Sequence, residues 1–236
     1  MAGMKERIIA ALDVETYKKA SDLVDILREE IDVFKVGIAP FTAFGERILE
    51  KISSAGKKVF LDLKVHDIPN TARNAARAAA EKEVFMMNFH CLGGEAMLRA
   101  AREGADSVKG ARRKPILLGV TVLTSMDKRA MEGIGLKPDI DEQVIKFASL
   151  AKNCGFDGVV ASAMEAGRIK EKFGKDFIVV TPGIRPSGAP EQDQKRTSTP
   201  SEAFRLGSDY IVVGRPIVDS PDPAEAARNI IREIKK

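Results

Sequence analysis

The sequence has few cysteines and lacks any long hydrophobic run. Its two cysteines, Cys91 and Cys154, do not form a CxxC pair, which argues against a disulfide framework and against a structural zinc site. No apolar stretch approaches the length needed to cross a membrane, and the residues before the first expected strand are too few for a signal peptide. We therefore expect a cytoplasmic protein with no membrane partner.

The chain also lacks a large excess of either charge. Its 236 residues include 38 Lys and Arg and 34 Asp and Glu, a formal net charge of +4. Because the basic residues are spread along the chain and interleaved with acids, they indicate solvated helix faces, and we expect no nucleic-acid partner. The small positive excess would suit an anionic small substrate. Hydrophobic residues at 44% and charged residues at 31% are typical of a globular enzyme and exclude a disordered chain.

Eight short apolar runs alternate with helical patterns. The runs are nearly continuous, as expected for parallel strands that are covered on both faces. They span residues 8–12, 33–38, 59–63, 85–89, 116–123, 158–162, 177–181 and 210–213. The helical patterns span residues 15–30, 42–54, 71–83, 95–107, 142–153, 165–173, 201–206 and 223–234. Eight strand–helix units predict one α/β domain, a TIM (β/α)₈ barrel over residues 1–236, with a doubly wound open sheet as the less favoured alternative.

Two connections in this pattern are long. One covers residues 124–139, after the fifth strand, and the other covers residues 182–199, after the seventh, where Gly, Pro, Ser and Gln are frequent. Long loops in a compact domain often close over a functional site.

The third strand ends in a cluster of charges. Residues 62–67 read Asp-Leu-Lys-Val-His-Asp. Asp62 and Lys64 share one face of the strand because side chains two apart point the same way, and Asp67 lies past the strand end. A lysine flanked by carboxylates stays protonated, and it keeps both acids ionised. A salt-bridged strand end with no further role is the alternative.

Polar residues also stand at the ends of other strands, where the active sites of (β/α)₈ barrels lie. Asp13 either belongs to such a site or caps the first helix. Lys35 lies inside an apolar strand, where a lysine must be paired or reach solvent, and this favours a functional role. His90 is better read as a core histidine, and Thr124 as either a site residue or an ordinary turn residue.

Gly214 and Arg215 follow the eighth strand. Barrels that bind phosphate commonly do so after strands 7 and 8, where a glycine lets backbone amides approach the anion and an arginine donates two hydrogen bonds. The dipeptide alone is not specific. Asp62 and Asp67 could bind Mg²⁺ with a third carboxylate, but Lys35 at the neighbouring strand end would repel a cation. We therefore expect no metal.

The segment Asp62–Thr71, with the sequence DLKVHDIPNT, closely resembles the signature of the orotidine 5'-phosphate decarboxylases. Further matches follow in order along the whole chain, at Ala11-Leu12-Asp13, Phe34-Lys35-Val36-Gly37, Val122-Leu123-Thr124-Ser125, Pro182-Gly183-Ile184-Arg185-Pro186 with Asp193-Gln194, and Val213-Gly214-Arg215-Pro216-Ile217. The third-strand motif is highly specific, whereas the Gly-Arg ending is shared with many phosphate-binding barrels.

The resemblance implies a homodimeric TIM barrel that removes CO₂ from orotidine monophosphate to give UMP, the last step of pyrimidine synthesis, without a metal or an organic cofactor. It implies that Asp62 lies against the departing carboxylate and that Lys64 delivers the proton to the ring carbon. Asp13 and Lys35 would contact the ribose hydroxyls. The resemblance thus predicts four catalytic residues, which are Lys35, Asp62, Lys64 and Asp67.

The resemblance also implies a set of substrate-binding residues. Asp67 and Thr71 would reach the partner subunit's site, with Ile68 between them. Thr124 and Ser125 would face the base. The loop 182–199 would close over the phosphate, whose site the resemblance assigns to Arg185, Gln194, Gly214 and Arg215. Pro182, at the start of this loop, is also a predicted substrate-binding residue.

Two other functions remain open from the sequence. Sugar-phosphate decarboxylases and aldolases on related barrels share the acid-lysine-acid pattern, but they hold Mg²⁺ partly through a carboxylate on the second strand. Lys35 at that position argues against them. The second alternative is a barrel that binds a phosphate ligand without catalysis.

Overall fold

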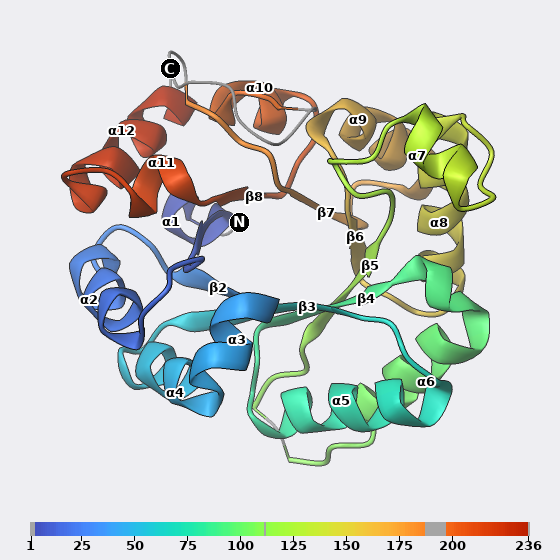
Figure 1. Ribbon diagram of the computed structural model, residues 1–236, viewed down its shortest axis with the longest axis horizontal. Helices are drawn as coiled ribbons and strands as arrows, with labels where there is room; N and C mark the ends of the chain where they lie inside the picture. The colour runs from blue at the N-terminus through green and yellow to red at the C-terminus, as the bar shows by residue number, and fades with distance from the viewer. Residues whose placement is uncertain (1–2, 111, 187–196, 236) are drawn as a thin grey trace.

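The computed structural model describes residues 3–110, 112–186 and 197–235, and its centre is a closed barrel of eight parallel strands in sequential order. Figure 1 shows the strands at the centre and the helices as a ring around them. This arrangement confirms the predicted TIM barrel. The strands β1–β8 are Ile8–Ala11, Val33–Gly37, Lys58–Val65, Met86–His90, Ile116–Val120, Gly158–Val160, Ile178–Thr181 and Tyr210–Val213.

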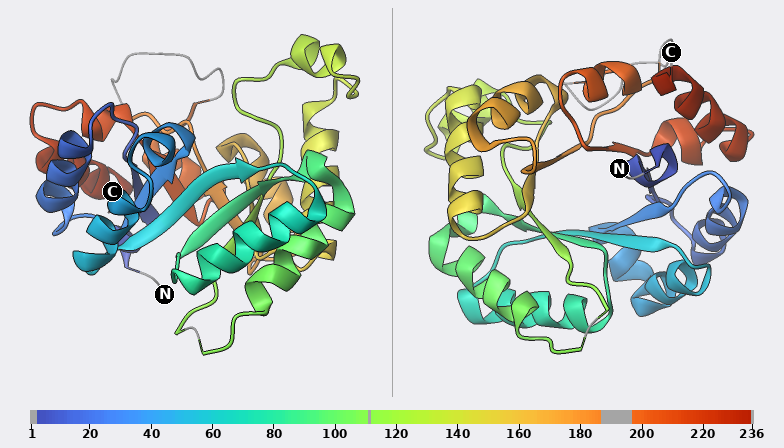
Figure 2. Two further views of the ribbon diagram at one scale, coloured as in Figure 1. Left: turned by 60° about the horizontal axis from the view of Figure 1, so that its bottom comes forward. Right: turned by 180° about the vertical axis from the view of Figure 1, so that it is seen from behind.

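Helices follow every strand. In chain order, α1–α12 are Met4–Arg7, Tyr17–Leu27, Ile38–Phe44, Glu46–Ser54, Pro69–Glu81, Gly94–Asp106, Lys128–Gly133, Ile140–Asn153, Ala163–Phe173, Pro200–Arg205, Arg215–Val218 and Pro223–Lys235, and a 3₁₀ turn, η1, covers Cys91–Gly93. Figure 2 shows α7 projecting from one end of the barrel and the N-terminus at the other. Within the described residues, no helix has the length and apolar character that a membrane span requires.

The elements differ from the expected ones mainly in five places. The expected helix over 42–54 is two helices, α3 and α4, because Gly45 interrupts it with φ +57°. Helix α1 precedes the first strand, where a direct start into the strand was expected, and α7 lies within the connection 124–139. Strand β5 ends at Val120 instead of residue 123, and β3 extends to Val65.

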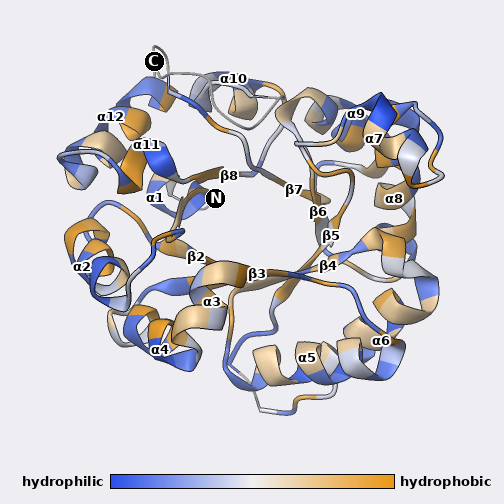
Figure 3. Ribbon diagram, viewed as in Figure 1, coloured by the Kyte–Doolittle hydropathy of each residue, from blue (hydrophilic) through white to orange (hydrophobic). Residues whose placement is uncertain are grey.

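Two apolar layers explain the strand sequences, and Figure 3 shows the strands as largely hydrophobic. Residues such as Ile8 and Ala10 face the helices, whereas Ile9 faces the barrel interior. The inner layer contains Ile9, Ala11, Val33, Phe60, Met86, Leu118, Val180 and Val212. Because side chains alternate along a strand, the residue two positions after each inner one also points inward, nearer the carboxyl end. Lys35 and Asp62 occupy such positions.

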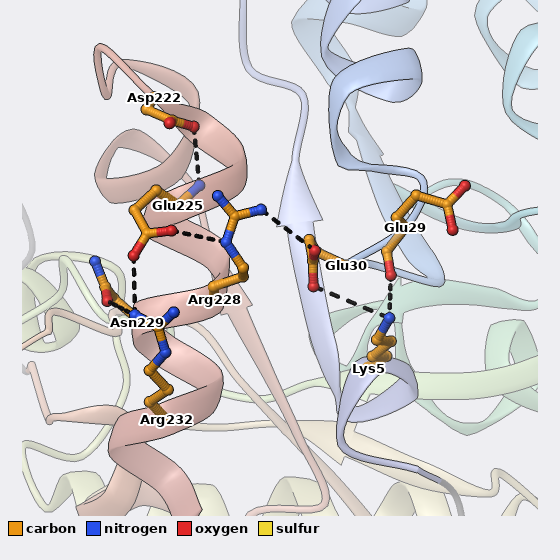
Figure 4. Close-up of polar contacts among 8 residues, drawn as sticks. All are labelled: Lys5, Glu29, Glu30, Asp222, Glu225, Arg228, Asn229 and Arg232. Carbon is orange, nitrogen blue, oxygen red and sulfur yellow. Dashed lines mark hydrogen bonds and ion pairs between the residues drawn. The ribbon is translucent and has the colours of Figure 1, made fainter.

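Polar contacts connect the last helix, α12, to the end of α2 and to α1. Arg228 on α12 pairs with Glu225 at 2.7 Å and with Glu30, after α2, at 3.4 Å. Lys5 on α1 pairs with Glu30 at 3.9 Å and also donates to the carbonyl of Glu29 (Figure 4). Surface ion pairs of this kind each contribute little, on the order of 0–1 kcal/mol. They join the two ends of the chain, while the buried strands supply most of the stability.

Candidate active site

A cavity of about 550 Å³ lies at the carboxyl ends of the strands. Its volume falls within the usual range of about 300–1,000 Å³ for small-molecule sites. Ten of the predicted site residues line it: Asp13, Lys35, Asp62, Lys64, Thr124, Ser125, Pro182, Arg185, Gly214 and Arg215. The structure therefore brings most of the predicted set together, whereas the role of each residue stays a prediction.

Four charged side chains of alternating sign form a row along one wall of the cavity. Lys35 Nζ lies 3.1 Å from Asp13 Oδ1 and 3.2 Å from Asp62 Oδ2. Lys64 Nζ lies 2.7 Å from Asp62 Oδ1. The side chains of Lys35 and Asp62 are only 9% and 11% exposed. Buried charges are costly unless they are paired, and here each charge has an opposite neighbour.

Asp62 is held in its ionised form. Burial acts to raise its pKa, but the charges of Lys35 and Lys64 and the hydrogen bonds from Lys64 and Asn88 together keep the pKa below its ordinary value of 3.8. The cavity wall therefore presents a fixed carboxylate between two ammonium groups. The Asp62 carboxylate would repel one anionic group of a ligand, while the ammonium groups of Lys35 and Lys64 would attract a second anionic or electron-rich group.

The backbone at Lys64 is unusual. Its φ of +48° lies in the left-handed region, which costs a residue other than glycine about 1–2 kcal/mol. Strand β3 advances four residues from Leu61 to Val65, while β4 advances two from Met87 to Phe89, so the ladder is irregular here. Local strain of this kind tends to occur at functional sites, where the surrounding contacts hold it.

Asn88 on β4 supports this irregular segment, and it was missed from the sequence. Its Nδ2 donates to Asp62 Oδ1 at 2.6 Å, and its Oδ1 accepts the backbone N–H of Lys64 at 2.8 Å. Asn88 is fully buried. A polar residue two positions after the inward Met86 is the signal that could have found it.

The opposite wall of the cavity, built by β5–β8, is mostly apolar. Val120, Val160 and Val212 line it. Its polar groups lie at the rim, where Arg185 and Arg215 come from the connections after β7 and β8. The backbone N–H of Arg185 donates to the carbonyl of Ser198 at 3.0 Å, which fixes the segment after β7. Two arginines beside an apolar wall can bind an anion at one end of a largely uncharged group.

Asp67, Ile68 and Thr71 do not line the cavity. All three are exposed in the turn after β3 and the first turn of α5, and Ile68 is 67% exposed. Asp67 lies past the end of β3, as expected. Their predicted contact with a partner's site stays a prediction. Gln194, and with it most of the connection 182–199, lies outside the described residues.

The structure decides two local questions. Of the two interpretations of Asp13, the helix cap is excluded, since Thr16 Oγ1 accepts the N–H of Lys19 and Asp13 lines the cavity. His90 is not a core residue: it is half-buried at the barrel rim, where its ring stacks on His66 at 5.7 Å. Burial, followed by the charges of His66 and Lys64, lowers the pKa of His90 from 6.5 to about 4.

Within residues 3–110, 112–186 and 197–235, no three His, Cys, Asp or Glu side chains group as metal ligands would. The position that a second-strand carboxylate would need is filled by Lys35, whose Nζ contacts both neighbouring acids.

Comparisons with known proteins identify the family of the chain. The family model described as "Orotidine 5'-phosphate decarboxylase / HUMPS family" matches residues 6–230. The orotidine 5'-phosphate decarboxylase of Moorella thermoacetica is 46% identical over 98% of this chain and 93% of its own length, and that of Vibrio atlanticus is 48% identical over 95% and 96%. The crystal structure of the Lactobacillus acidophilus enzyme of the same name is 36% identical with a TM-score of 0.86, over 98% of this chain and all of that one. The chain therefore belongs to the orotidine 5'-phosphate decarboxylase / HUMPS family.

Proposed function

We propose that Lys64 and Asp62 carry out the decarboxylation of orotidine 5'-monophosphate (OMP) to uridine 5'-monophosphate (UMP), the reaction of pyrimidine biosynthesis that the chain catalyses as a carboxy-lyase. The observation that carries this proposal is the row of alternating charges from Asp13 to Lys64 at the cavity wall. It supplies a fixed anion and a fixed cation side by side, which is what loss of CO₂ followed by protonation requires.

The chemistry needs no oxidant or reductant. The bond between the ring carbon and the carboxylate breaks, its electron pair stays on the ring carbon, and CO₂ leaves. The Lys64 ammonium stabilises the negative charge as it develops and then transfers one proton to the ring carbon. The neutral amine regains a proton from water. One proton is consumed for each CO₂ released, so the step balances.

Asp62 acts on the substrate before the bond breaks. Its carboxylate would face the substrate's carboxylate, and two unit charges about 4 Å apart interact by roughly 4 kcal/mol at an effective dielectric constant of 20. That repulsion disappears as CO₂ departs. Only part of it raises the rate, because the two neighbouring lysines offset the charge of Asp62.

The remaining groups bind the substrate. Arg185 and Arg215, with Gly214, would hold the phosphate, and the predicted role of Gln194 is the same. Binding energy from this distant group can offset the cost of holding two carboxylates together. Asp13 and Lys35 would contact the ribose, Thr124, Ser125 and Pro182 would lie along the base and its rim, and the loop 182–199 would close over the bound nucleotide.

The proposal extends to a cytoplasmic homodimer. Exposed apolar side chains in the segments that follow β2, β3 and β4 support a partner surface: Ile38 (56% exposed), Ile68 (67%) and Leu92 (40%). Asp67 and Thr71 would cross this surface into the partner's cavity. The cytoplasm is supported by Cys91 and Cys154, which are both unpaired and buried.

An Ile68→Asp variant tests the dimer. We expect sedimentation analysis to show a dimer for the natural chain and a shift toward monomer for the variant, since a charge would be buried in the interface. Ile26, which is 48% exposed on α2, provides the matched control as Ile26→Asp. A natural chain that sediments as a monomer, or an Ile68→Asp variant as dimeric as the control, would contradict the proposed interface.

The metal-free reaction is tested directly. We expect purified protein mixed with OMP to show loss of the near-ultraviolet absorbance of OMP at the same rate with and without EDTA. The Mg²⁺-dependent sugar-phosphate enzymes are the competing function, and Lys35 is the residue that argues against them. A strict requirement for Mg²⁺ would favour that alternative.

A further inference from the structure

Asn88 is a buried polar residue that joins the two proposed catalytic groups. It follows the inward-facing Met86 by two positions on β4, and none of its surface is exposed. Its Nδ2 donates to Asp62 Oδ1 at 2.6 Å, and its Oδ1 accepts the backbone N–H of Lys64 at 2.8 Å. It is not among the residues that line the cavity, so it contacts the reacting groups and not the ligand space.

Only an amide in one orientation satisfies both neighbours. Asp62 is an acceptor and needs a donor, whereas the N–H of Lys64 needs an acceptor. A flipped amide would set its NH₂ against the N–H of Lys64 and its oxygen against the carboxylate of Asp62. A leucine supplies neither contact, and an ionised aspartate has no proton to donate to Asp62. The chemistry of this position therefore selects asparagine.

The irregular ladder explains why a side chain is needed here. Between Leu61 and Val65, β3 has two more residues than the facing part of β4, and Lys64 adopts φ +48° within this segment. Its N–H donates to the side chain of Asn88 instead of a backbone carbonyl of β4. Asn88 thus holds the backbone conformation that directs Lys64 Nζ to within 2.7 Å of Asp62 Oδ1.

We propose that Asn88 is a positioning residue for decarboxylation, which fixes the carboxylate of Asp62 and the ammonium of Lys64 in the relative arrangement that CO₂ loss and proton transfer require. This inference rests on the roles proposed above for Asp62 and Lys64. Asn88 itself touches no substrate atom and transfers no proton.

An Asn88→Leu variant removes both hydrogen bonds at similar volume. We expect kcat to fall about 100-fold, the effect of a displacement of roughly 1 Å at a catalytic group. The affinity for UMP should change less than about threefold, since the phosphate and ribose contacts remain. Thr121→Val is the matched control, because Thr121 is also buried at a strand end and donates to the carbonyl of Val160 at 2.8 Å, away from the charged row. Its kcat should remain within about threefold of that of the natural chain.

An Asn88→Asp variant separates positioning from a merely structural role. The ionisable groups around this position are Lys35 on β2, Asp62 and Lys64 on β3, and His90 on β4. While the introduced carboxyl is protonated, it can donate to Asp62 and accept from Lys64. Once it ionises, it repels Asp62 and has no donor for it. Its kcat relative to that of the natural chain should therefore decrease as pH rises, whereas the same ratio for Asn88→Leu should be independent of pH.

The results are decisive in either direction. A kcat for Asn88→Leu within about threefold of the natural value would overturn the inference, and so would a pH-independent ratio for Asn88→Asp. If Asn88→Leu does not fold, as judged by circular dichroism, the pH profile of Asn88→Asp decides alone. Lys64→Ala distinguishes the two proposals: an active Lys64→Ala variant would refute the proposed chemistry, whereas an inactive one together with a fully active Asn88→Leu would refute only the positioning role.

Discussion

The two halves of the cavity wall have the same architecture and opposite chemistry. The first half, from β1 to β4, carries Asp13, Lys35, Asp62 and Lys64 in contacts of 2.7–3.2 Å. The second half, from β5 to β8, is largely apolar and has its charges only at the rim. The repeated fold therefore does not dictate chemistry, which depends on the one layer of side chains beyond the barrel interior.

The register of the strands makes this contrast specific. On β2 and β3, the residues two positions after the inner layer are Lys35 and Asp62. The corresponding residue on β5 is Val120. Charges that are buried and close together change the energy of a reacting group far more than charges in water do. We infer that the first half performs the chemistry and that the second half, with its rim arginines, binds the nucleotide.

Removal of the Lys64 ammonium should have the largest effect. In a Lys64→Ala variant, the carbanion loses both its stabilising charge and its proton donor. We expect kcat to fall at least about 10³-fold, the size of effects measured for such groups. The loss of OMP absorbance measures it, and circular dichroism checks the fold. Unchanged turnover would eliminate the proposed mechanism and favour a barrel that only binds phosphate ligands.

Loss of the central carboxylate should reduce stability. Asp62→Asn leaves Lys64 without its acidic neighbour and Lys35 with Asp13 alone, so we expect the free energy of unfolding to fall by about 3 kcal/mol, the lower end of the cost of breaking a buried pair. Urea unfolding measures it. Asp25→Asn, which breaks the exposed contact with Lys51, should cost less than about 1 kcal/mol. Equal costs for the two variants would show that the charged half is no more demanding than the surface.

The pH dependence of stability should show the smallest effect, at the rim of the charged half. The folded pKa of His90 is about 4 and its ordinary value is 6.5, so the unfolded chain binds more protons between these values. The contribution of His90 to the free energy of unfolding is therefore complete above pH 6.5 and is lost as pH falls toward 4. Because the ring is partly exposed, we expect a loss of only about 1 kcal/mol after solvent screening.

A His90→Gln variant tests this assignment by comparison with the natural chain. The unfolding free energy of the natural chain minus that of the variant should decrease as pH falls from 7 to 4, because only the natural chain carries the titrating imidazole. A difference that stays constant over that range would assign the titration to another group.

The strands could be predicted, because burial on two faces leaves a continuous apolar run in the sequence. The charged half could be predicted only in part. A local motif identified Asp62, Lys64 and Asp67, but nothing local signals that a lysine adopts φ +48°. The role of Asn88 depends on a contact between residues that are 26 positions apart in the chain.

Two smaller points have the same origin. The local sequence left Asp13 as either a helix cap or a site residue, and it does not show the ion pair that Asp13 forms with Lys35 of the next strand. Gly45 falls inside a helical apolar pattern, and the pattern does not tell whether the chain continues through it or bends there. The local sequence allowed two alternatives in each case. A contact between distant segments decided the case of Asp13, and the backbone conformation decided the case of Gly45.

The most direct test of the division between the two halves is the affinity for UMP, measured by calorimetry on Lys64→Ala and Arg215→Ala. We expect opposite results for the two variants. Lys64→Ala should bind UMP within about threefold of the natural affinity although it has lost turnover, whereas Arg215→Ala should bind UMP about 30-fold more weakly, as expected for loss of a charge-assisted contact of roughly 2 kcal/mol. If Lys64→Ala lost UMP affinity as severely as it lost turnover while Arg215→Ala bound normally, the proposed division would be wrong.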